Sequence, residues 1–263
     1  MALPEDMALK ELNIESVRDR VSAEEWETRV NLAAAYRLAA HYGWDDLIYT
    51  HISARVPNSD HHFLMNPLGL LFEEITASSL VKVDLEGNIL MDTPFIANKA
   101  GFVIHSALHA AREDAMCVMH LHTDYGIAVS NLEGGLKPTC QSAIFPWALT
   151  AYHEFEGLAV RDDEKERLVA DMGDKQALIL RNHGTLTVGR SIAKAFEAMY
   201  FLERACKIQI LSEAAGKLHM PPREAIDNTL RDLRAVAGAN GADLLVWPAL
   251  LRKLDRMDPG FRA

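Results

Sequence analysis

The chain has few of the features that mark secreted, membrane-spanning or nucleic-acid-binding proteins. Its 263 residues include three cysteines, Cys117, Cys140 and Cys206, an odd number without Cys-x-x-Cys spacing. This pattern indicates neither a disulfide framework nor a four-cysteine zinc site. The 27 Lys and Arg residues are outnumbered by 37 Asp and Glu residues, giving a formal charge of −10. Because phosphate binding depends on basic side chains, we expect no nucleic-acid partner.

Long apolar runs are missing as well. No uninterrupted apolar stretch approaches the roughly 20 residues that a membrane-spanning helix needs. The N-terminal segment, with Glu5, Asp6 and Glu11, lacks the charge pattern and apolar centre of a signal peptide. The hydrophobic share of 49% and the charged share of 24% are those of an ordinary globular protein. We therefore expect a cytoplasmic, reduced protein with one large core and no membrane partner.

Two histidines separated by one residue lie in an apolar segment, Cys117-Val118-Met119-His120-Leu121-His122. The segment predicts a buried strand, on which both rings point to the same face, roughly 7 Å apart along the chain. A third histidine, His183, follows another predicted strand, 177–181, and precedes Gly184. Three imidazoles can hold a metal such as Zn²⁺ and leave its fourth position open for water or substrate. The alternative for His-x-His alone is a pair of core histidines bonded within the fold.

Further segments, in the same order along the chain, carry a family resemblance. They are Gly43 to Arg55, Asn66 to Asp84, Ala100 to Ala107, His120 to Thr123, Leu180 to Gly184 and Ala205 to Gln209. From about Glu24 to Gly216 the sequence resembles the class II aldolase/adducin family, and within it the adducin head domain most closely. The resemblance implies an α/β fold, a three-layer α/β/α domain with a central, largely antiparallel sheet. It also implies a homotetramer with active sites near subunit interfaces. The divalent metal of the family, commonly zinc, would be held by the residues matching its ligands, His120, His122 and His183.

Two stretches differ from the family's sugar-phosphate enzymes. Those enzymes carry Ser-Ser-Glu or Ser-Ser-Asp four residues before the histidine that matches His105, where this chain has Lys99-Ala100-Gly101. Gly101 cannot transfer a proton. The Gly-Asn pair that helps those enzymes bind phosphate is Thr50-His51 here. Both differences disfavour a phosphorylated sugar and leave the proton-transfer role vacant.

The candidates for that vacant role are His51, Lys99 and Tyr152. His51 could orient a substrate oxygen or carry a proton near neutral pH. The ammonium of Lys99 could capture a carboxylate as a point charge, with an ordinary solvated lysine as the alternative. Tyr152 belongs to a polar cluster that adducin heads share, which also fits a structural role.

The sequence thus predicts a metal-dependent carbon–carbon lyase for a small hydroxy-carbonyl or hydroxy-acid substrate without phosphate. Retro-aldol cleavage or decarboxylation would be the reaction. Zn²⁺ is the first choice, and Mn²⁺, Fe²⁺ or Co²⁺ also suit imidazole ligands. The alternative is a non-catalytic oligomeric scaffold, because adducin heads share both departures and serve the cytoskeleton.

The remaining pattern predicts an arm at residues 1–21, one domain over 22–237, and a tail at 238–263 that packs on its own or a neighbouring subunit. Strands are expected at 47–56, 62–66, 80–84 and 88–91. Helices are expected from Ser22 to Gly43, from Lys99 to Arg112, from Asp162 to Met172 and from Ser191 to Gly216. His105 and His109 have the i, i+4 spacing of some zinc sites but lack the accompanying glutamate, so we expect structural roles for them.

Overall fold

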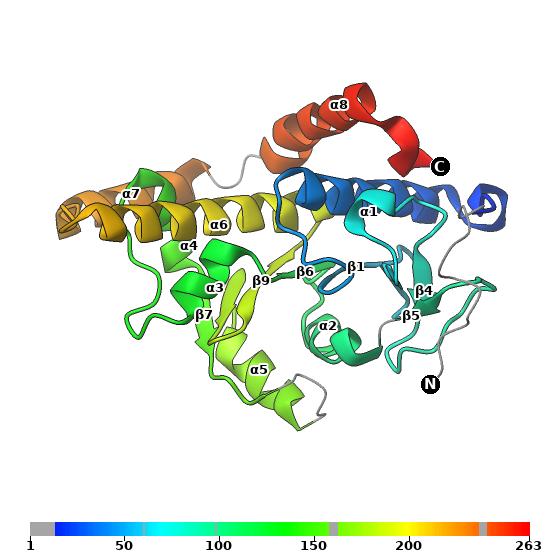
Figure 1. The fold of residues 1–263 in the computed structure, drawn as a ribbon, viewed down its shortest axis with the longest axis horizontal. Helices are drawn as coiled ribbons and strands as arrows, with labels where there is room; N and C mark the ends of the chain where they lie inside the picture. Colours follow the sequence, from blue (N-terminus) through cyan, green and yellow to red (C-terminus); the bar gives the residue numbers. More distant parts are fainter. Residues whose placement is uncertain (1–13, 60, 98, 158–162, 237–240) are drawn as a thin grey trace.

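The computed structural model describes residues 14–59, 61–97, 99–157, 163–236 and 241–263, and only the backbone of 99–102, 234 and 236. A seven-stranded sheet forms its middle layer. Helices α1 (Ala23–His41) and α6 (Ile192–Ala215) cover one face, and α2 (Lys99–Ala111) and α5 (Glu164–Met172) cover the other (Figure 1). The three-layer α/β/α architecture expected from the sequence is confirmed.

The sheet has the strand order β4-β2-β1-β6-β9-β8-β7. Every neighbouring pair is antiparallel except β7 and β8, so the prediction of a largely antiparallel sheet is also confirmed. A separate two-stranded sheet joins β3 (Pro67–Leu68) to β5 (Ile96–Ala97). The bounds of the seven strands are β1 His51–Arg55, β2 Phe63–Met65, β4 Val81–Val83, β6 Cys117–Leu121, β7 Thr150–His153, β8 Ala177–Leu180 and β9 Gly184–Gly189.

Two strands differ from the expectation. β1 begins at His51 rather than at 47, because Leu47 and Thr50 have φ of 52° and 66°, in the left-handed region that an extended strand cannot use. The strand predicted at 88–91 is wrong: the segment forms one isolated bridge, between Ile89 and Val83. Ile89 and Leu90, the apolar pair that suggested a strand, are both exposed, so they do not form the buried face of a strand.

The long helices match their predicted ends. The Ser22 hydroxyl accepts a hydrogen bond from the Glu25 amide at 3.1 Å, and the Ser191 hydroxyl accepts one from the Lys194 amide at 3.1 Å. Each satisfies an amide that the first turn leaves without a helical partner. α5 begins at Glu164, and the predicted start at Asp162 lies outside the described residues. The other helices are α3 Asp124–Ser130, α4 Gln141–Ala148, α7 Arg223–Val236 and α8 Trp247–Met257.

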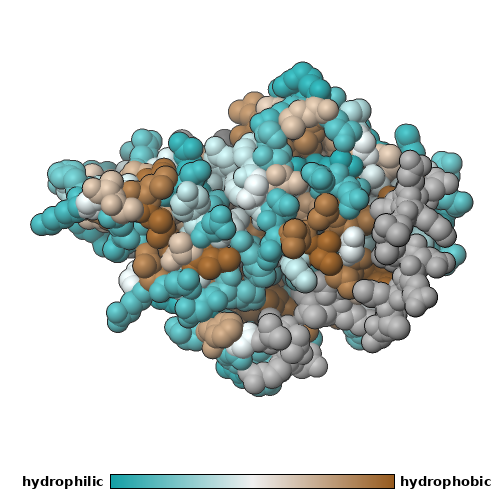
Figure 2. Space-filling view, in the orientation of Figure 1, coloured by the Kyte–Doolittle hydropathy of each residue, from teal (hydrophilic) through white to brown (hydrophobic). Residues whose placement is uncertain are grey.

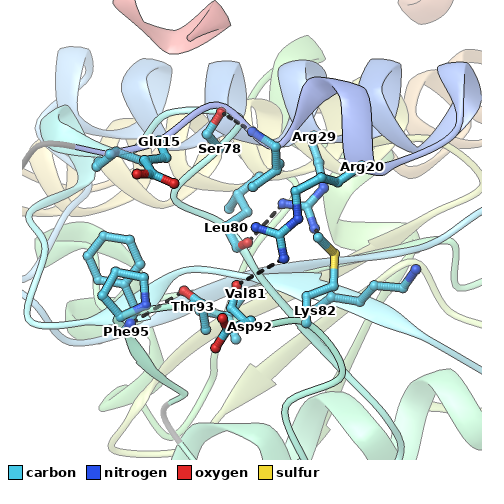
Figure 3. A pocket seen from close by; sticks show the side chains of 14 residues that line it. Glu15, Arg20, Arg29, Ser78, Leu80, Val81, Lys82, Asp92, Thr93 and Phe95 are labelled. Atoms are coloured by element: carbon cyan, nitrogen blue, oxygen red, sulfur yellow. Dashed lines mark hydrogen bonds between the residues drawn. The ribbon is translucent and has the colours of Figure 1, made fainter.

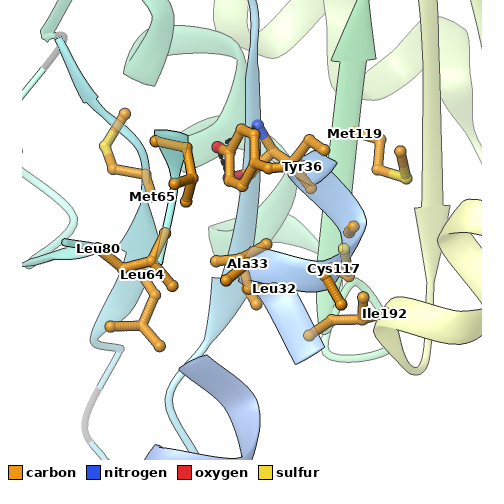
Figure 4. Close-up of a cluster of buried hydrophobic side chains, with 14 of the residues drawn as sticks. Leu32, Ala33, Tyr36, Leu64, Met65, Leu80, Cys117, Met119 and Ile192 are labelled. Atoms are coloured by element: carbon orange, nitrogen blue, oxygen red, sulfur yellow. Dashed lines mark hydrogen bonds between the residues drawn. The ribbon is translucent and has the colours of Figure 1, made fainter. Parts of the chain in front are cut away.

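The main core lies between α1 and the sheet (Figure 4). Small residues such as Ala33 lie on the face of α1 that packs on the sheet, and Leu64 and Met65 of β2 in the same core are fully buried or nearly so. Tyr36 of α1 reaches β1, since its hydroxyl accepts the Ile52 amide at 2.7 Å and lies 2.8 Å from Asn66 Oδ1. α1 therefore fixes the position of β1, the strand that carries His51.

A cavity of about 410 Å³ lies between the start of α1 and the segments 78–82 and 91–95 (Figure 3). Buried Arg29 lines it and donates to the carbonyls of Ala77 and Leu80 at 3.2 and 2.8 Å. Glu25 accepts from Arg29 at 3.0 Å and from Lys82 at 2.7 Å, so one carboxylate balances two cations. None of the three predicted metal ligands lines this cavity.

Both ends of the described chain pack on the same molecule. Val17 is buried and its amide donates to Ser78 Oγ at 3.4 Å, whereas residues 1–13 of the predicted arm lie outside the described residues. In the predicted tail, Trp247, Leu254 and Phe261 are buried. The Trp247 indole donates to Asn31 Oδ1 of α1 at 2.6 Å. No helix within the described ranges has the length and apolar character needed to cross a bilayer.

Candidate metal centre

The fold brings His120, His122 and His183 together where β6 ends and β9 begins. β6 and β9 are antiparallel neighbours with Leu121 opposite Thr185, so the residues after β6 lie beside those before β9. One ring nitrogen from each histidine lies within 4.8 Å of the others. The ring centroids are 4.8 to 4.9 Å apart. Residues far apart in the sequence thus form one three-nitrogen cluster.

Hydrogen bonds fix the orientation of two of the rings. His120 Nδ1 lies 3.1 Å from the Thr185 carbonyl oxygen, and His122 Nδ1 lies 2.9 Å from Asp46 Oδ2. Because a carbonyl and a carboxylate oxygen accept, each Nδ1 carries a proton, which leaves Nε2 as the ring nitrogen that can ligate a metal. His122 Nε2 is buried and has no partner within the described chain. A buried nitrogen without a partner is costly, and a cation shared by the three rings would satisfy it.

Two of the rings, His120 and His183, also have the protonation state that metal ligation needs. Burial lowers the pKa of His120 well below its ordinary value, and the neighbouring histidines lower it further. Burial, followed by the charge of His122, lowers the pKa of His183 to about 4. Both imidazoles are therefore neutral near pH 7, the form that donates a lone pair to a metal.

Gly184 allows the close approach of the two strand ends. A Cβ atom at this position would lie 2.7 Å from the Leu121 carbonyl oxygen and 3.1 Å from His122 Cδ2. Any larger residue would push β9 away from β6 and separate His183 from His120 and His122. Steric crowding therefore explains why glycine follows His183 in the sequence.

His51 lies beside the cluster. It is the direct partner of His120 across β1 and β6, and the two ring centroids are 6.1 Å apart. Burial, and then the charges of His122 and His183, lowers the pKa of His51 to about 3. Lys99 is the first residue of α2, but its side chain, and with it the predicted role, lies outside the described residues.

Tyr152 does not join the cluster within one chain. Tyr152 packs against the core cluster that contains Leu202 of α6, whereas Ala151 packs on the α2 side of the sheet, so Tyr152 lies on the face opposite to His120. Its hydroxyl accepts the Leu136 amide at 2.9 Å, and the Arg181 guanidinium lies 4.3 Å from its ring centroid. These contacts give Tyr152 a packing role between the sheet and the 132–137 loop.

His105 and His109 of α2 connect this helix to β1 through hydrogen bonds. Ser53 Oγ lies 2.6 Å from His105 Nδ1 and 2.7 Å from His109 Nε2. His109 Nδ1 donates to the Ala115 carbonyl at 2.7 Å, so its Nε2 must accept the Ser53 proton. All three side chains are buried. These contacts fit the structural roles expected from the sequence.

Asp46 is the contact that sequence reasoning missed. Seventy-six positions separate it from His122, and Asp45-Asp46 has no spacing that links it to a histidine. The aspartate pair lies within the segment that carries the family resemblance, but no property of that segment distinguishes Asp46 from its exposed neighbour. Only the folded chain reveals the contact.

Comparison with known proteins decides the family. The model of the "Class II Aldolase and Adducin N-terminal domain" matches residues 30–210 of the chain. The chain belongs to the class II aldolase and adducin family. The crystal structure of an aldolase II superfamily protein from Pseudomonas syringae has 52% sequence identity and a TM-score of 0.89, covering 95% of this chain and all of that one.

Two other similar proteins are an aldolase and an adducin. An L-fuculose 1-phosphate aldolase from Glaciozyma antarctica is 30% identical with a TM-score of 0.81, and the match covers 97% of each chain. Alpha-adducin of Rattus norvegicus is 47% identical over 193 residues, which are 72% of this chain and only 26% of the adducin. The chain is thus similar both to a named aldolase over nearly its whole length and to about a quarter of a much longer adducin.

A buried acid supports the segment that follows His122. The Thr123 hydroxyl donates to Glu203 Oε2 of α6 at 2.5 Å and also accepts the Gly126 amide at the start of α3. Burial is the main cause that raises the pKa of Glu203 from 4.5 to about 7. Because the pKa of Glu203 is higher in the folded chain than in the unfolded chain, its protonation stabilises the fold. This stabilisation is fully present below about pH 4.5 and is lost as pH rises through about 7.

We therefore expect Glu203→Gln to change the free energy of unfolding, relative to wild type, more favourably at pH 8 than at pH 5. The two pKa values correspond to a difference of about 3 kcal/mol, and the uncharged amide removes that dependence. Urea unfolding at both pH values, with wild type alongside, measures it. Glu224→Gln, on the exposed surface of α7, is the matched control and should change little at either pH. Equal effects of Glu203→Gln at the two pH values would contradict the raised pKa.

Proposed function

We propose that this chain is a divalent-metal-dependent lyase that breaks a carbon–carbon bond. Its substrate would be a small hydroxy-carbonyl or hydroxy-acid compound without phosphate, cleaved by retro-aldol reaction or decarboxylation. The observation that carries the proposal is the cluster of His120, His122 and His183, whose nitrogens lie within 4.8 Å of one another. Membership of the class II aldolase and adducin family supports the same reading.

The donor set suits one metal ion. His120, His122 and His183 would hold it through three imidazole nitrogens and leave one side open, as catalytic zinc sites do. Zn²⁺ is our first choice, and Mn²⁺, Fe²⁺ and Co²⁺ remain compatible with imidazole. When bound, the cation supplies Lewis acidity that stabilises negative charge developing on substrate oxygens. His122 and His183 are only partly buried, which leaves a route for substrate.

His51 is our candidate for the substrate-facing residue beside the cluster. A base whose conjugate acid has a pKa of about 3 accepts protons poorly near pH 7, so His51 suits hydrogen bonding to a substrate oxygen better than proton abstraction. Lys99, at the start of α2, is our candidate for binding a substrate carboxylate. Tyr152 is left out, because it lies on the other face of the sheet.

The absence of phosphate from the proposed substrate rests on two stretches of the sequence. Thr50-His51 replaces the Gly-Asn pair that the resemblance assigns to phosphate binding. Lys99-Ala100-Gly101 replaces the segment whose serines hold the phosphate and whose acid transfers a proton. Against this stands the similarity to an L-fuculose 1-phosphate aldolase at 30% identity. A substrate screen must therefore contain phosphorylated and phosphate-free members.

A non-catalytic scaffold is the second candidate. The 47% identity to alpha-adducin and the missing acid at Gly101 favour it. Retained histidines alone do not separate it from an enzyme, because a metal can also be structural. Turnover is what distinguishes the two.

We also propose a cytoplasmic homotetramer with the site near a subunit contact, as the family resemblance implies. Leu244 and Leu245 are 70% and 72% exposed, and Val246 beside them is exposed too. Figure 2 also shows apolar side chains gathered below α6, where α3 and α4 lie. Apolar groups gathered in this way are typical of surfaces that another chain covers.

The experiment combines metal analysis with a screen. Freshly purified protein is assayed for bound metal, and then for cleavage of hydroxy acids, aldols and their phosphate esters, with His120→Ala as the control. We expect bound metal and turnover of a phosphate-free compound in wild type, and neither in the variant. Turnover that persists unchanged in His120→Ala would refute metal-dependent catalysis. Metal without any turnover would favour the scaffold.

A further inference from the structure

We infer that Asp46 is a positioning residue of the proposed metal centre, which it serves by holding His122 in the ligating tautomer and orientation. The inference rests on the proposed metal site and adds a carboxylate to it. Asp46 Oδ2 accepts the His122 Nδ1 proton at 2.9 Å. The opposite ring nitrogen, His122 Nε2, is buried and without a partner in the described chain, and it belongs to the three-nitrogen cluster.

The arrangement is that of a carboxylate–histidine–metal triad. A carboxylate that accepts from one ring nitrogen keeps the lone pair on the other, stops the ring from flipping, and makes that lone pair more basic. For His120 the Thr185 carbonyl plays this part at 3.1 Å. Asp46 differs because it brings a full negative charge, so it also offsets part of the charge of a divalent cation. Of the two partners, only Asp46 can be changed by substitution of a side chain.

The local backbone indicates that this position of Asp46 is specified. The Tyr49 amide donates to the Asp46 carbonyl at 2.8 Å and closes a tight turn. Leu47 within the turn and Thr50 directly after it have φ of 52° and 66°, which is unfavourable for non-glycine residues and most of all for β-branched Thr50. Strain of this kind persists where surrounding structure demands a particular geometry. Here the turn delivers a carboxylate to the ring of His122.

The rival interpretation is an ordinary surface ion pair. The side chains of Asp46 and His122 are 43% and 24% exposed, and pairs of such exposure contribute little to stability. A surface pair and a positioning contact differ in one property. Removing a surface pair leaves metal affinity unchanged, whereas removing a carboxylate that orients a metal ligand lowers it.

The test measures Zn²⁺ affinity by competition with a chromophoric chelator, on the full chain first stripped of metal. Asp46→Ala, Asp46→Asn and Asp45→Ala are compared with wild type. Asp45 is the matched control, because it is the exposed residue directly before Asp46 and its loss removes the same charge. We expect Asp46→Ala to weaken Zn²⁺ binding by about 10–100-fold. Asp46→Asn keeps an acceptor without the charge and should lie between that value and wild type, and Asp45→Ala should stay within about twofold.

A second readout follows the geometry of the site. Co²⁺ in place of Zn²⁺ gives visible absorption bands that depend on ligand arrangement, so Asp46→Ala should shift them and Asp45→Ala should not. Equal affinities and spectra for Asp46→Ala and Asp45→Ala would overturn the inference and leave the proposed metal site standing. Wild type that binds neither ion would instead overturn the metal site, and the role of Asp46 with it.

Discussion

His183→Ala is expected to abolish tight Zn²⁺ binding and, with it, any metal-dependent turnover. His183 supplies the only nitrogen of the cluster that comes from the loop between β8 and β9, so its loss leaves two ligands from one segment. The loss should exceed the 10–100-fold that removal of an outer hydrogen-bond partner causes. Because the ring is only partly buried, the fold itself should survive.

Thermal unfolding with and without Zn²⁺ measures this effect without a substrate. A ligand present at about 100 times its Kd stabilises the folded state by about 2.7 kcal/mol. Wild type should therefore melt at a higher temperature with Zn²⁺ than without, and His183→Ala should melt equally under both conditions. His219→Ala removes an exposed histidine beyond α6 and should keep the full zinc-dependent shift. A shift that persists in His183→Ala would mean that the zinc binds elsewhere.

The three candidate ligands were accessible from sequence because two independent signals coincided. His120 and His122 share a face through the period of a strand, and His183-Gly184 follows a second apolar strand segment closely. Asp46 was not accessible, because a lone carboxylate 76 positions away carries no periodic signal. Tyr152 was chosen from a motif, but strand alternation across the sheet turns it toward α6, and a motif does not say which face its residues occupy.

The fold was predicted well where local and long-range preferences agree. Ser22 and Ser191 cap α1 and α6 as their sequences indicate, since a cap depends on neighbours within the same turn. The strand at 88–91 failed, because Ile89-Leu90 has the composition of a strand but no neighbour that buries it. Likewise the start of β1 depends on the turn at Leu47 and Thr50, where contacts override the extended preference of an apolar run.

Phe261→Ala is expected to cost about 3–5 kcal/mol of stability, the usual range for truncating a fully buried aromatic residue. The Phe261 side chain is completely buried in the main core, and the Ala77 amide donates to its carbonyl at 3.0 Å. Residues near the end of the predicted tail therefore pack against the same chain and contribute to the core that holds α1. For a chain of this size the loss should lower the melting temperature by roughly 10 °C.

Urea unfolding of Phe261→Ala at several protein concentrations separates packing within one subunit from packing on a neighbour. If the phenyl ring fills its own subunit, the loss of stability should be independent of concentration. Leu245→Ala is the matched control, since Leu245 lies in the same segment but is 72% exposed and should change the free energy of unfolding by at most about 0.5 kcal/mol. A wild-type melting temperature for Phe261→Ala would contradict burial in the core. A loss that grows on dilution would assign the ring to a neighbouring subunit, where the tail would then act as a subunit contact instead of a part of one domain.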